Sequence, residues 1–382
     1  MINEKLVPKL RFSEFSDDWE NIKIGDCLDV KYGKDYKHLN KGQYPLLGTG
    51  GVMEYVDDFL YSGESILIGR KGTIDKPKYI NDSFWTVDTL FYTEIKKQFP
   101  KFLFYCISNI NWLKYNEASG VPSLSANNIK NIKINVPSLN EQKKIANFIT
   151  CIDYKTELLE KKYELYVDFK KYVMQQIFTQ KLRFKDENND FYENWEELHL
   201  KDIISLNGGY AFKSEFFKDE GIPIIRISNI STNNSVILDD LVYYDKLKND
   251  SEFIIKKGEL IIAMSGATTG KVAVYDFEHE SYINQRVGLF KKTSSKLYYP
   301  FLVQYTLSDS FKRELQKTLV AGAQPNISKK EIESFSIKLP QYEEQEKIAD
   351  LLSNLDLKIN TIKNQNNELS MFKKSLLQQM FV

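Results

Sequence analysis

The stretch SGATTGKV, residues 265–272, places glycine, threonine and lysine directly after the apolar residues 260–264. Such a composition could bind phosphate, because a phosphate loop arranges backbone amides and a lysine around phosphate oxygens. A Walker loop, however, has four residues between its glycines and a hydroxyl residue after the lysine. Here three residues separate Gly266 from Gly270, and Val272 follows Lys271. The spacing therefore argues against nucleotide binding.

The first half of the chain contains a counterpart of this loop, since SGESILIGRKGTIDK at 62–76 matches KKGELIIAMSGATTGK at 256–271. Related loops in corresponding places favour a shared ligand, and a polyanion with repeated phosphates suits both loops. The loops at 30–42 and 70–79 are rich in lysine, which neutralises phosphates. Arginine can donate two hydrogen bonds to guanine, and asparagine and glutamine can pair with adenine edges.

On this basis we predict nucleic-acid contacts in both halves, more basic in the first and more polar in the second. The predicted contacts of the first half are Lys34, Tyr36, Lys37, Thr49, Arg70, Lys71 and Thr73. Those of the second half are Tyr210, Lys213, Arg226, Ser228, Asn229, Ser265, Thr268, Thr269, Lys271, Asn284, Gln285 and Arg286. For any one of them, a solvated lysine or an ordinary turn hydrogen bond is the alternative interpretation.

Catalytic patterns are not found in the sequence. The histidines His38, His199 and His279 are isolated and lack metal-ligand spacing. Asp88 with the segment 94–96 (Glu-Ile-Lys) distantly resembles a nuclease carboxylate–lysine set, a combination that also arises by chance. We therefore predict no catalytic and no metal-binding residues.

The elements that must position these loops are duplicated. Residues 137–178 align without a gap on residues 340–381, and fourteen of 42 positions are identical. The identities include Glu141/Glu344, Gln142/Gln345, Asp153/Asp356 and Lys170/Lys373. The motif KLRF, at 9–12 and 181–184, precedes a Trp-Glu pair in each half. The chain is therefore an internal repeat.

Both repeated segments have the spacing of a coiled-coil seam. Eight of ten seam positions are apolar or aromatic in each segment. They are 145, 149, 152, 156, 159, 163, 166, 170, 173 and 177 in the first, and 348, 352, 355, 359, 362, 366, 369, 373, 376 and 380 in the second. Because the connection at 181–194 is short, the helices should pair antiparallel. Two amphipathic helices in separate cores are the alternative.

The remaining segments are typical of mixed α/β structure. Short apolar runs bounded by glycine predict strands, and the stretches 99–115 and 299–320 predict helices. The chain has 382 residues, with 52 basic and 52 acidic side chains, which argues against a non-specific polycation. Three scattered cysteines, an N-terminus without an export signal and the lack of a long apolar run favour a cytoplasmic protein and exclude a membrane span.

This arrangement resembles the specificity subunit of type I restriction–modification systems. The residues that carry the resemblance are the KLRF…WE lead-ins, the blocks GESILIGRKGT and GELIIAMSGATTG, and the twin segments NEQKKIANFITCIDYKTELLEKK and YEEQEKIADLLSNLDLKINTIK. The resemblance implies two mixed α/β target recognition domains, at 1–136 and 195–339, related by a pseudo-two-fold repeat. The long helices, at 137–180 and 340–382 with a linker at 181–194, would form an antiparallel coiled coil between them.

The same resemblance implies a non-catalytic subunit that reads a bipartite, asymmetric site in double-stranded DNA. Two modification subunits, which bind S-adenosylmethionine, and two restriction subunits, which use ATP and Mg²⁺, would assemble on it, and no cofactor is expected in this chain. The alternatives are a standalone nuclease or nucleotide hydrolase, and a coiled-coil scaffold that does not bind DNA. A nuclease needs metal-binding carboxylates, and a pure scaffold does not need glycine-containing basic loops.

Overall fold

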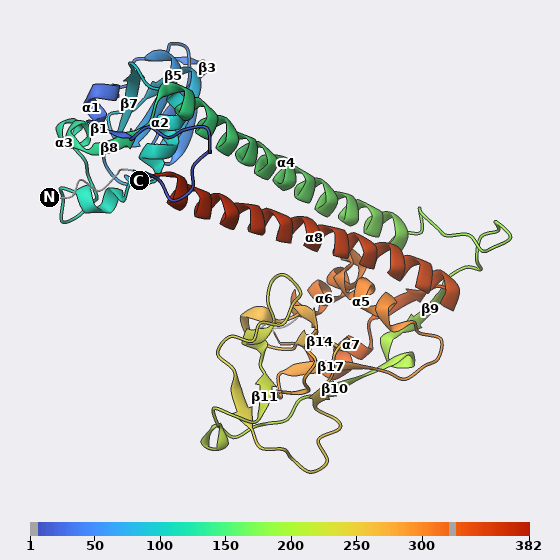
Figure 1. Ribbon diagram of the computed structural model, residues 1–382. Coiled ribbons are helices and arrows are strands. Elements are labelled where there is room, and N and C mark those ends of the chain that lie inside the picture. The colour runs from blue at the N-terminus through green and yellow to red at the C-terminus, as the bar shows by residue number, and fades with distance from the viewer. Residues whose placement is uncertain (1–6, 321–325) are drawn as a thin grey trace. The chain divides into compact units, whose positions relative to one another are not determined.

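The computed structural model describes residues 7–320 and 326–382, which form two compact units (Figure 1). Unit 1 comprises the chain up to Lys161 together with Ile362–Val382, and unit 2 comprises Lys162–Thr361. Each unit combines a mixed α/β block with parts of the two long helices, α4 (Leu139–Phe178) and α8 (Tyr342–Met380). In the part of the chain that is described, no helix is both long and apolar enough to cross a membrane.

The two long helices run antiparallel, as predicted (Figure 1). Asp153, early in α4, forms an ion pair with Lys373, late in α8. Lys170, late in α4, lies 2.6 Å from Asp356, early in α8. The residue numbers of the two pairs have the same sum, which is the signature of an antiparallel register kept along both helices.

The predicted seam is confirmed on both helices, since all of its positions are buried or half-buried. In unit 1, Ile149 and Ile152 of α4 share one core with Leu376 of α8. In unit 2, Val173 and Ile177 of α4 share another core with residues of the first turns of α8, including Ile348 and Leu352. Apolar burial at every third and fourth position therefore holds the pair together.

Unit 1 is built on a six-stranded sheet with the order β2-β7-β5-β6-β3-β4. Ile66 and Ile68 of β5 face a core that contains Phe102 of helix α2 (Pro100–Ser108), whereas Leu67 faces a second cluster with Phe84. Burial on both faces explains why this strand is a continuous apolar run. The strands are β2 Leu28–Tyr32, β3 Lys41–Gly48, β4 Gly51–Val56, β5 Tyr61–Gly69, β6 Lys78–Thr86 and β7 Leu90–Ile95, and a separate pair joins β1 Glu20–Lys23 to β8 Lys133–Val136. The helices are α1 Ile24–Cys27, α2 Pro100–Ser108, η1 Trp112–Tyr115 and α3 Ala126–Asn131.

Unit 2 divides the equivalent strands between two sheets, β10-β17-β14-β15 and β12-β11-β16-β13. The strands are β9 Glu196–His199, β10 Ile204–Gly208, β11 Ile222–Ile225, β12 Val242–Tyr244, β13 Ile254–Ile255, β14 Leu260–Ala263, β15 Val272–Val274, β16 Ser281–Ile283, β17 Val287–Lys292 and β18 Ser336–Leu339. The helices are η2 Leu200–Asp202, η3 Ser214–Phe216, η4 Ile227–Asn229, η5 Gly266–Thr268, α5 Tyr299–Leu307, α6 Asp309–Val320 and α7 Lys329–Glu333. Strand β9 pairs with β18.

The two blocks share one topology. The antiparallel set β2-β7-β5 corresponds to β10-β17-β14. In each block a parallel pair, β3 with β6 or β11 with β16, lies beside an antiparallel neighbour. The repeat seen in the helices therefore extends through the two α/β blocks.

Two predicted helices are interrupted in the structure. The stretch 99–115 forms α2 and then the separate 3-10 helix η1, and the indole of Trp112 donates to the carbonyl of Ile107 across the break. The stretch 299–320 breaks at Ser308, whose ψ of 159° is extended. The Ser308 hydroxyl donates to the Tyr305 carbonyl at 2.6 Å and accepts from the Phe311 amide at 3.4 Å, so it ends α5 and begins α6.

Candidate functional site

In unit 1 the predicted contact residues follow the ends of strands β2, β3 and β5. Lys34, two residues beyond β2, donates its backbone amide to Thr86 at the end of β6. Thr49, in the turn between β3 and β4, has its hydroxyl 3.6 Å from where a Cβ on Gly72 would lie. The structure thus brings the β3–β4 turn close to the loop after β5. Of the predicted residues, Lys34, Lys37, Lys71 and Thr73 are exposed, and Tyr36, Thr49 and Arg70 are half-buried.

Arg70 is the most constrained of these side chains. Its guanidinium lies over the ring of Tyr32, 5.6 Å from the ring centre. Its Nη1 donates to the backbone carbonyl of Asp88 at 3.0 Å and lies 3.8 Å from that residue's carboxylate. The backbone is also held, because Arg70 donates to Thr89 at 2.8 Å and accepts from Leu124 at 2.9 Å. The sequence did not predict Tyr32 as a partner of Arg70, although Tyr32 ends β2, which belongs to the same sheet as β5.

In unit 2 the predicted residues are gathered by backbone pairing around the turn between β16 and β17. Tyr210 is bridged to Asn284, and its carbonyl accepts from the amide of Gln285 at 3.0 Å. Arg286 accepts from the amide of Met264 and donates from Nη1 to the hydroxyl of Ser265 at 3.1 Å. The ends of β10, β14 and β16 therefore meet at one surface, where Tyr210, Gln285 and Arg286 are exposed.

Two predicted residues of this group are buried, Asn229 with 3% and Ser265 with 6% of its surface exposed. Asn229 accepts from the amide of Arg226 and donates to the carbonyls of Ile237 and Asp239, each at 3.0 Å. Its amide side chain therefore holds together the loop between β11 and β12. In this conformation Asn229 and Ser265 support the surface rather than form it. Lys213 and Ser228 are exposed on neighbouring segments.

The loop after β14 is not built as a nucleotide loop. Gly266–Thr268 forms the short turn η5, and strand β15 follows after Lys271. A phosphate loop instead leads into a helix whose N-terminus faces the phosphate. The hydroxyl of Thr268 donates to Ile227 at 3.3 Å and that of Thr269 to Gly266 at 2.7 Å, while Lys271 is half-buried.

The loops after β5 and β14 have the same backbone frame. Leu124 donates to Arg70, and Ile327 donates to Met264, at 2.9 Å in both cases. Gly72 and Gly266 occupy the matching turn positions with φ of 90° and 78°, which disfavour side chains. Because Arg70 matches Met264 in this frame, the two loops present different side chains from equivalent places.

The residues that could indicate nuclease chemistry are separated. Asp88 precedes β7 and lies beside Arg70, whereas Glu94 is near the other end of β7 and lies 3.1 Å from Lys31. Lys96 pairs with Asp29 at 2.8 Å. Over residues 7–320 and 326–382, no group of three or more His, Cys, Asp or Glu side chains is placed to hold a metal ion.

A family model described as the type I restriction modification DNA specificity domain matches residues 16–165 and 192–371, one match in each half. The chain belongs to this family. As a specificity subunit it is the recognition component and not the catalyst of its system. The two matches each cover a block together with a large part of one long helix, in agreement with the repeat.

Among the relatives of this specificity subunit is the type I restriction enzyme MjaVIII specificity subunit of Methanocaldococcus jannaschii, 27% identical over 98% of this chain and 94% of its own. The EcoKI specificity subunit of Escherichia coli K12 is 26% identical over 45% of this chain and 38% of its own. The crystal structure of the S subunit from M. genitalium has the same fold, with a TM-score of 0.70 and 17% identity over 98% of this chain and 99% of that one.

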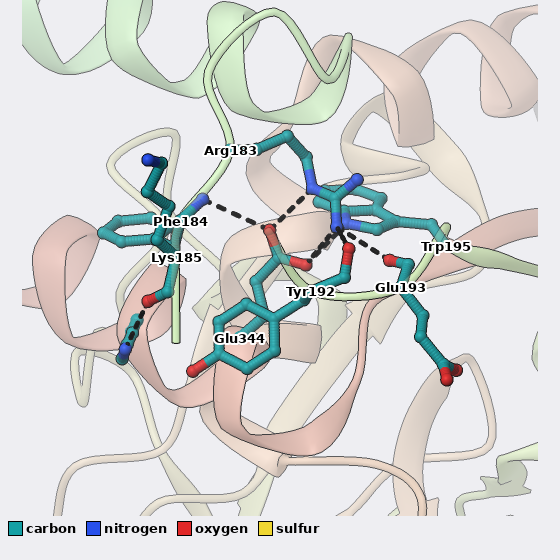
Figure 2. A network of polar contacts seen from close by, with 8 residues as sticks. Arg183, Phe184, Lys185, Tyr192, Glu193, Trp195 and Glu344 are labelled. Carbon is teal, nitrogen blue, oxygen red and sulfur yellow. Dashed lines mark hydrogen bonds and ion pairs between the residues drawn. The ribbon is translucent and has the colours of Figure 1, made fainter. Parts of the chain in front are cut away.

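A buried ion pair that sequence reasoning did not identify fastens the lead-in of unit 2 to the start of α8 (Figure 2). Arg183 donates from Nε and Nη2 to the two carboxylate oxygens of Glu344, at 2.7 and 2.8 Å. Its Nη2 also donates to the carbonyls of Tyr192 and Glu193. The indole of Trp195 also donates to Glu344, at 2.9 Å. One fully buried carboxylate therefore binds both Arg183 and Trp195 of the lead-in.

Unit 1 repeats this ion pair with one difference. Arg11 donates from Nε and Nη2 to Glu141, at 2.8 Å each, and the bond raises the pKa of Arg11 above its ordinary value. The indole nitrogen of Trp19, however, is buried without a partner among the described residues, and its ring lies against Phe102 and Phe381. The signal for both networks was present in the repeated KLRF, Trp-Glu and Glu-Gln motifs.

Proposed function

We propose that this specificity subunit reads a bipartite, asymmetric site in double-stranded DNA, with the block at 1–136 contacting one half-site and the block at 195–339 the other. Two modification subunits and two restriction subunits assemble on it in the cytoplasm. S-adenosylmethionine, ATP and Mg²⁺ act in those partners, and this chain holds no cofactor. The family supports the role in recognition, and the duplication supports two readers.

The observation that carries the proposal is the shared frame of the loops after β5 and β14. Equivalent backbone bonds hold both loops, yet Arg70 and Lys71 stand where the second block has Met264 and Ser265. A duplicated scaffold with different side chains at its strand ends is suited to two different base sequences. A symmetric site would instead call for the same side chains in both loops.

Local rather than overall charge supports binding to DNA. The chain has 52 basic and 52 acidic residues, so the whole surface does not attract phosphates. The exposed lysines Lys34, Lys37 and Lys71 all belong to loops of unit 1. Phosphate contacts there would fix position, and the side chains at the strand ends would supply sequence preference.

A block exchange tests the proposal. We would replace residues 195–339 with the corresponding block of a relative that has another target, and map the methylated sites in a host that carries the complete system. One half of the motif should change and the other should persist. The reciprocal exchange of residues 1–136 serves as the matched control and should change the opposite half. If both halves changed in each exchange, or neither did, the model of two readers would be wrong.

A binding experiment separates the alternative functions. The purified chain, with and without its modification subunits, is titrated with duplex DNA containing the mapped motif and with a scrambled duplex. Sequence-selective binding supports the proposal, whereas a pure scaffold binds neither duplex. A standalone nuclease would cut DNA without any partner.

A further inference from the structure

Arg70, Tyr32 and Asp88 form a cluster at one end of the six-stranded sheet. Tyr32 is the last residue of β2, Arg70 follows β5 directly, and Asp88 lies between β6 and β7. The cation–π contact to Tyr32 and the hydrogen bond to the Asp88 carbonyl restrain the guanidinium from two sides. The ring of Tyr32 is in turn packed edge-on against Phe91, at 5.1 Å between centres.

The cluster is restrained but accessible. The side chain of Arg70 is 32% exposed and that of Asp88 is 72% exposed. Arginine held in one orientation loses little side-chain entropy on binding, and its planar fork matches a pair of acceptors. A free guanidinium edge and a carboxylate therefore face solvent next to each other.

The carboxylate of Asp88 determines whether this cluster is better suited to a phosphate group or to a base edge. Asp88 lies 3.8 Å from the guanidinium and would repel a phosphate bound there. The major-groove edge of a G·C pair has two acceptors on guanine and an amino donor on cytosine. Arginine can donate to guanine O6 and N7, and an acidic side chain can accept from cytosine N4. The Arg70–Asp88 pair thus offers donors and an acceptor that are complementary to those of one G·C pair, and it lacks the net positive charge expected of a phosphate clamp.

Resting on the proposed function, we propose that Arg70 and Asp88 together read one G·C base pair in the half-site of unit 1, with Tyr32 as the positioning residue. The second unit has Met264 at the place of Arg70 in the matching frame. The corresponding position of the other half-site is therefore not read by an arginine–carboxylate pair.

The test uses the complex of this chain with its modification subunits and duplexes in which each base pair of the mapped motif is replaced in turn. Arg70→Lys keeps the charge but loses the two parallel donors, so preference for G·C at one position should fall about 5- to 150-fold. Asp88→Ala should weaken preference at the same position. Tyr32→Ala should weaken it less, and Tyr32→Phe, which retains the ring, should leave it unchanged.

Lys97→Ala is the matched control, because it removes an exposed charge of the same block beyond the opposite end of β7. It should alter no base preference. Melting curves identify any variant that unfolds. Arg70→Lys is the variant expected to disturb folding least, because it keeps the charge and most of the side chain. The salt dependence of binding should stay the same for Arg70→Lys.

The outcomes separate the two proposals. If Asp88→Ala strengthened binding to all duplexes and Arg70→Lys left every preference intact, the cluster would be a phosphate contact and this inference would be overturned while the proposed function stood. If the wild-type complex showed no sequence preference at all, the proposed function would fail and the inference with it. Loss of preference at a single G·C position supports both.

Discussion

Lys170 of α4 donates to both carboxylate oxygens of Asp356 on α8, at 2.6 Å each. Asp356 also accepts from the amide of Gln304, at 3.0 Å. Its repeat counterpart, Asp153, accepts from the hydroxyl of Tyr105 at 2.7 Å and pairs with Lys373. In each unit, one aspartate therefore ties the partner helix and the α/β block to its own helix. The Asp and the Lys that are identical in both repeats therefore pair across the helices, each Asp with the Lys of the other helix.

Removing one partner of the buried pair should destabilise unit 2. Lys170 is 8% exposed, so Asp356→Ala leaves an almost buried ammonium without a counter-ion. Because Asp356 itself is partly exposed, we expect a loss of about 1–3 kcal/mol in the free energy of unfolding. Urea unfolding followed by circular dichroism measures it. Glu157→Ala, which breaks an exposed pair with Lys161 on the same helix, should cost less than about 1 kcal/mol. Equal losses in the two variants would contradict the importance of burial.

Substitution of the buried carboxylate of Glu344 should reduce the free energy of unfolding more than substitution of Asp356 does. Glu344→Ala leaves Arg183, whose side chain is 13% exposed, without its carboxylate, at a cost of about 3–5 kcal/mol. Glu344→Gln should also change the fluorescence of Trp195 in the folded protein, because the indole donates to this residue. Glu141→Gln is the matched variant of unit 1 and should leave Trp19 emission unchanged, since that indole makes no such bond. Emission must be read with the other tryptophans replaced by phenylalanine, and equal shifts in both units would contradict the difference.

Thiol chemistry should distinguish the three cysteines. Cys27 and Cys106 are buried, and burial raises their thiol pKa to about 11 and about 12. Cys151 is exposed. At pH 8 a maleimide should therefore label Cys151 quickly and the other two only after unfolding. Mass spectrometry of labelled peptides gives the answer, with Cys151→Ser as the control.

The same pKa shifts give a direction for stability at alkaline pH. Both thiols have raised pKa values in the folded state, compared with an ordinary value of 9.0. Their contribution to stability is fully present below pH 9 and is lost as the pH rises through about 11 to 12. Cys27→Ala with Cys106→Ala should reduce the alkaline loss in urea unfolding measured between pH 8 and 10.5. An unchanged pH dependence would show that folding does not raise the pKa of these thiols.

Lys71 and Lys271 provide a prediction for phosphate contacts. If each neutralises a phosphate, alanine should weaken binding to all sequences alike and reduce the salt slope by roughly one per residue. Titrations at several salt concentrations measure this, with Lys97→Ala as control. A change of base preference without a change of slope would instead assign these lysines to base edges.

The seams were predictable from residue spacing, the repeat from the match between the two halves, and the antiparallel pairing from the short connection at 181–194, all of which can be seen in the sequence itself. The interruption at Ser308 was not, since it depends on a hydroxyl that ends one helix and begins another. The burial of Asn229 depends on carbonyls of Ile237 and Asp239, eight and ten residues along the chain. The contact of Arg70 with Tyr32 joins two strands that are distant in sequence. Base preference at each residue stays a prediction, because no local pattern determines it.

The connection after β3 is a two-residue turn, whereas the equivalent connection after β11 runs from residue 226 to residue 241. The side chain of Asn229 donates to the carbonyls of Ile237 and Asp239 within this longer connection. The parallel strand pairing beside both connections is the same. Asn229, Ile230 and Val236 of the longer connection are buried, whereas residues 232–235 are exposed. Mutations at this exposed tip are therefore separated from the packing beneath it. Selection can therefore act on the residues that the tip displays while Asn229, Ile230 and Val236 meet the demands of folding, so that the sequence of the tip can change at little cost to the rest of the molecule.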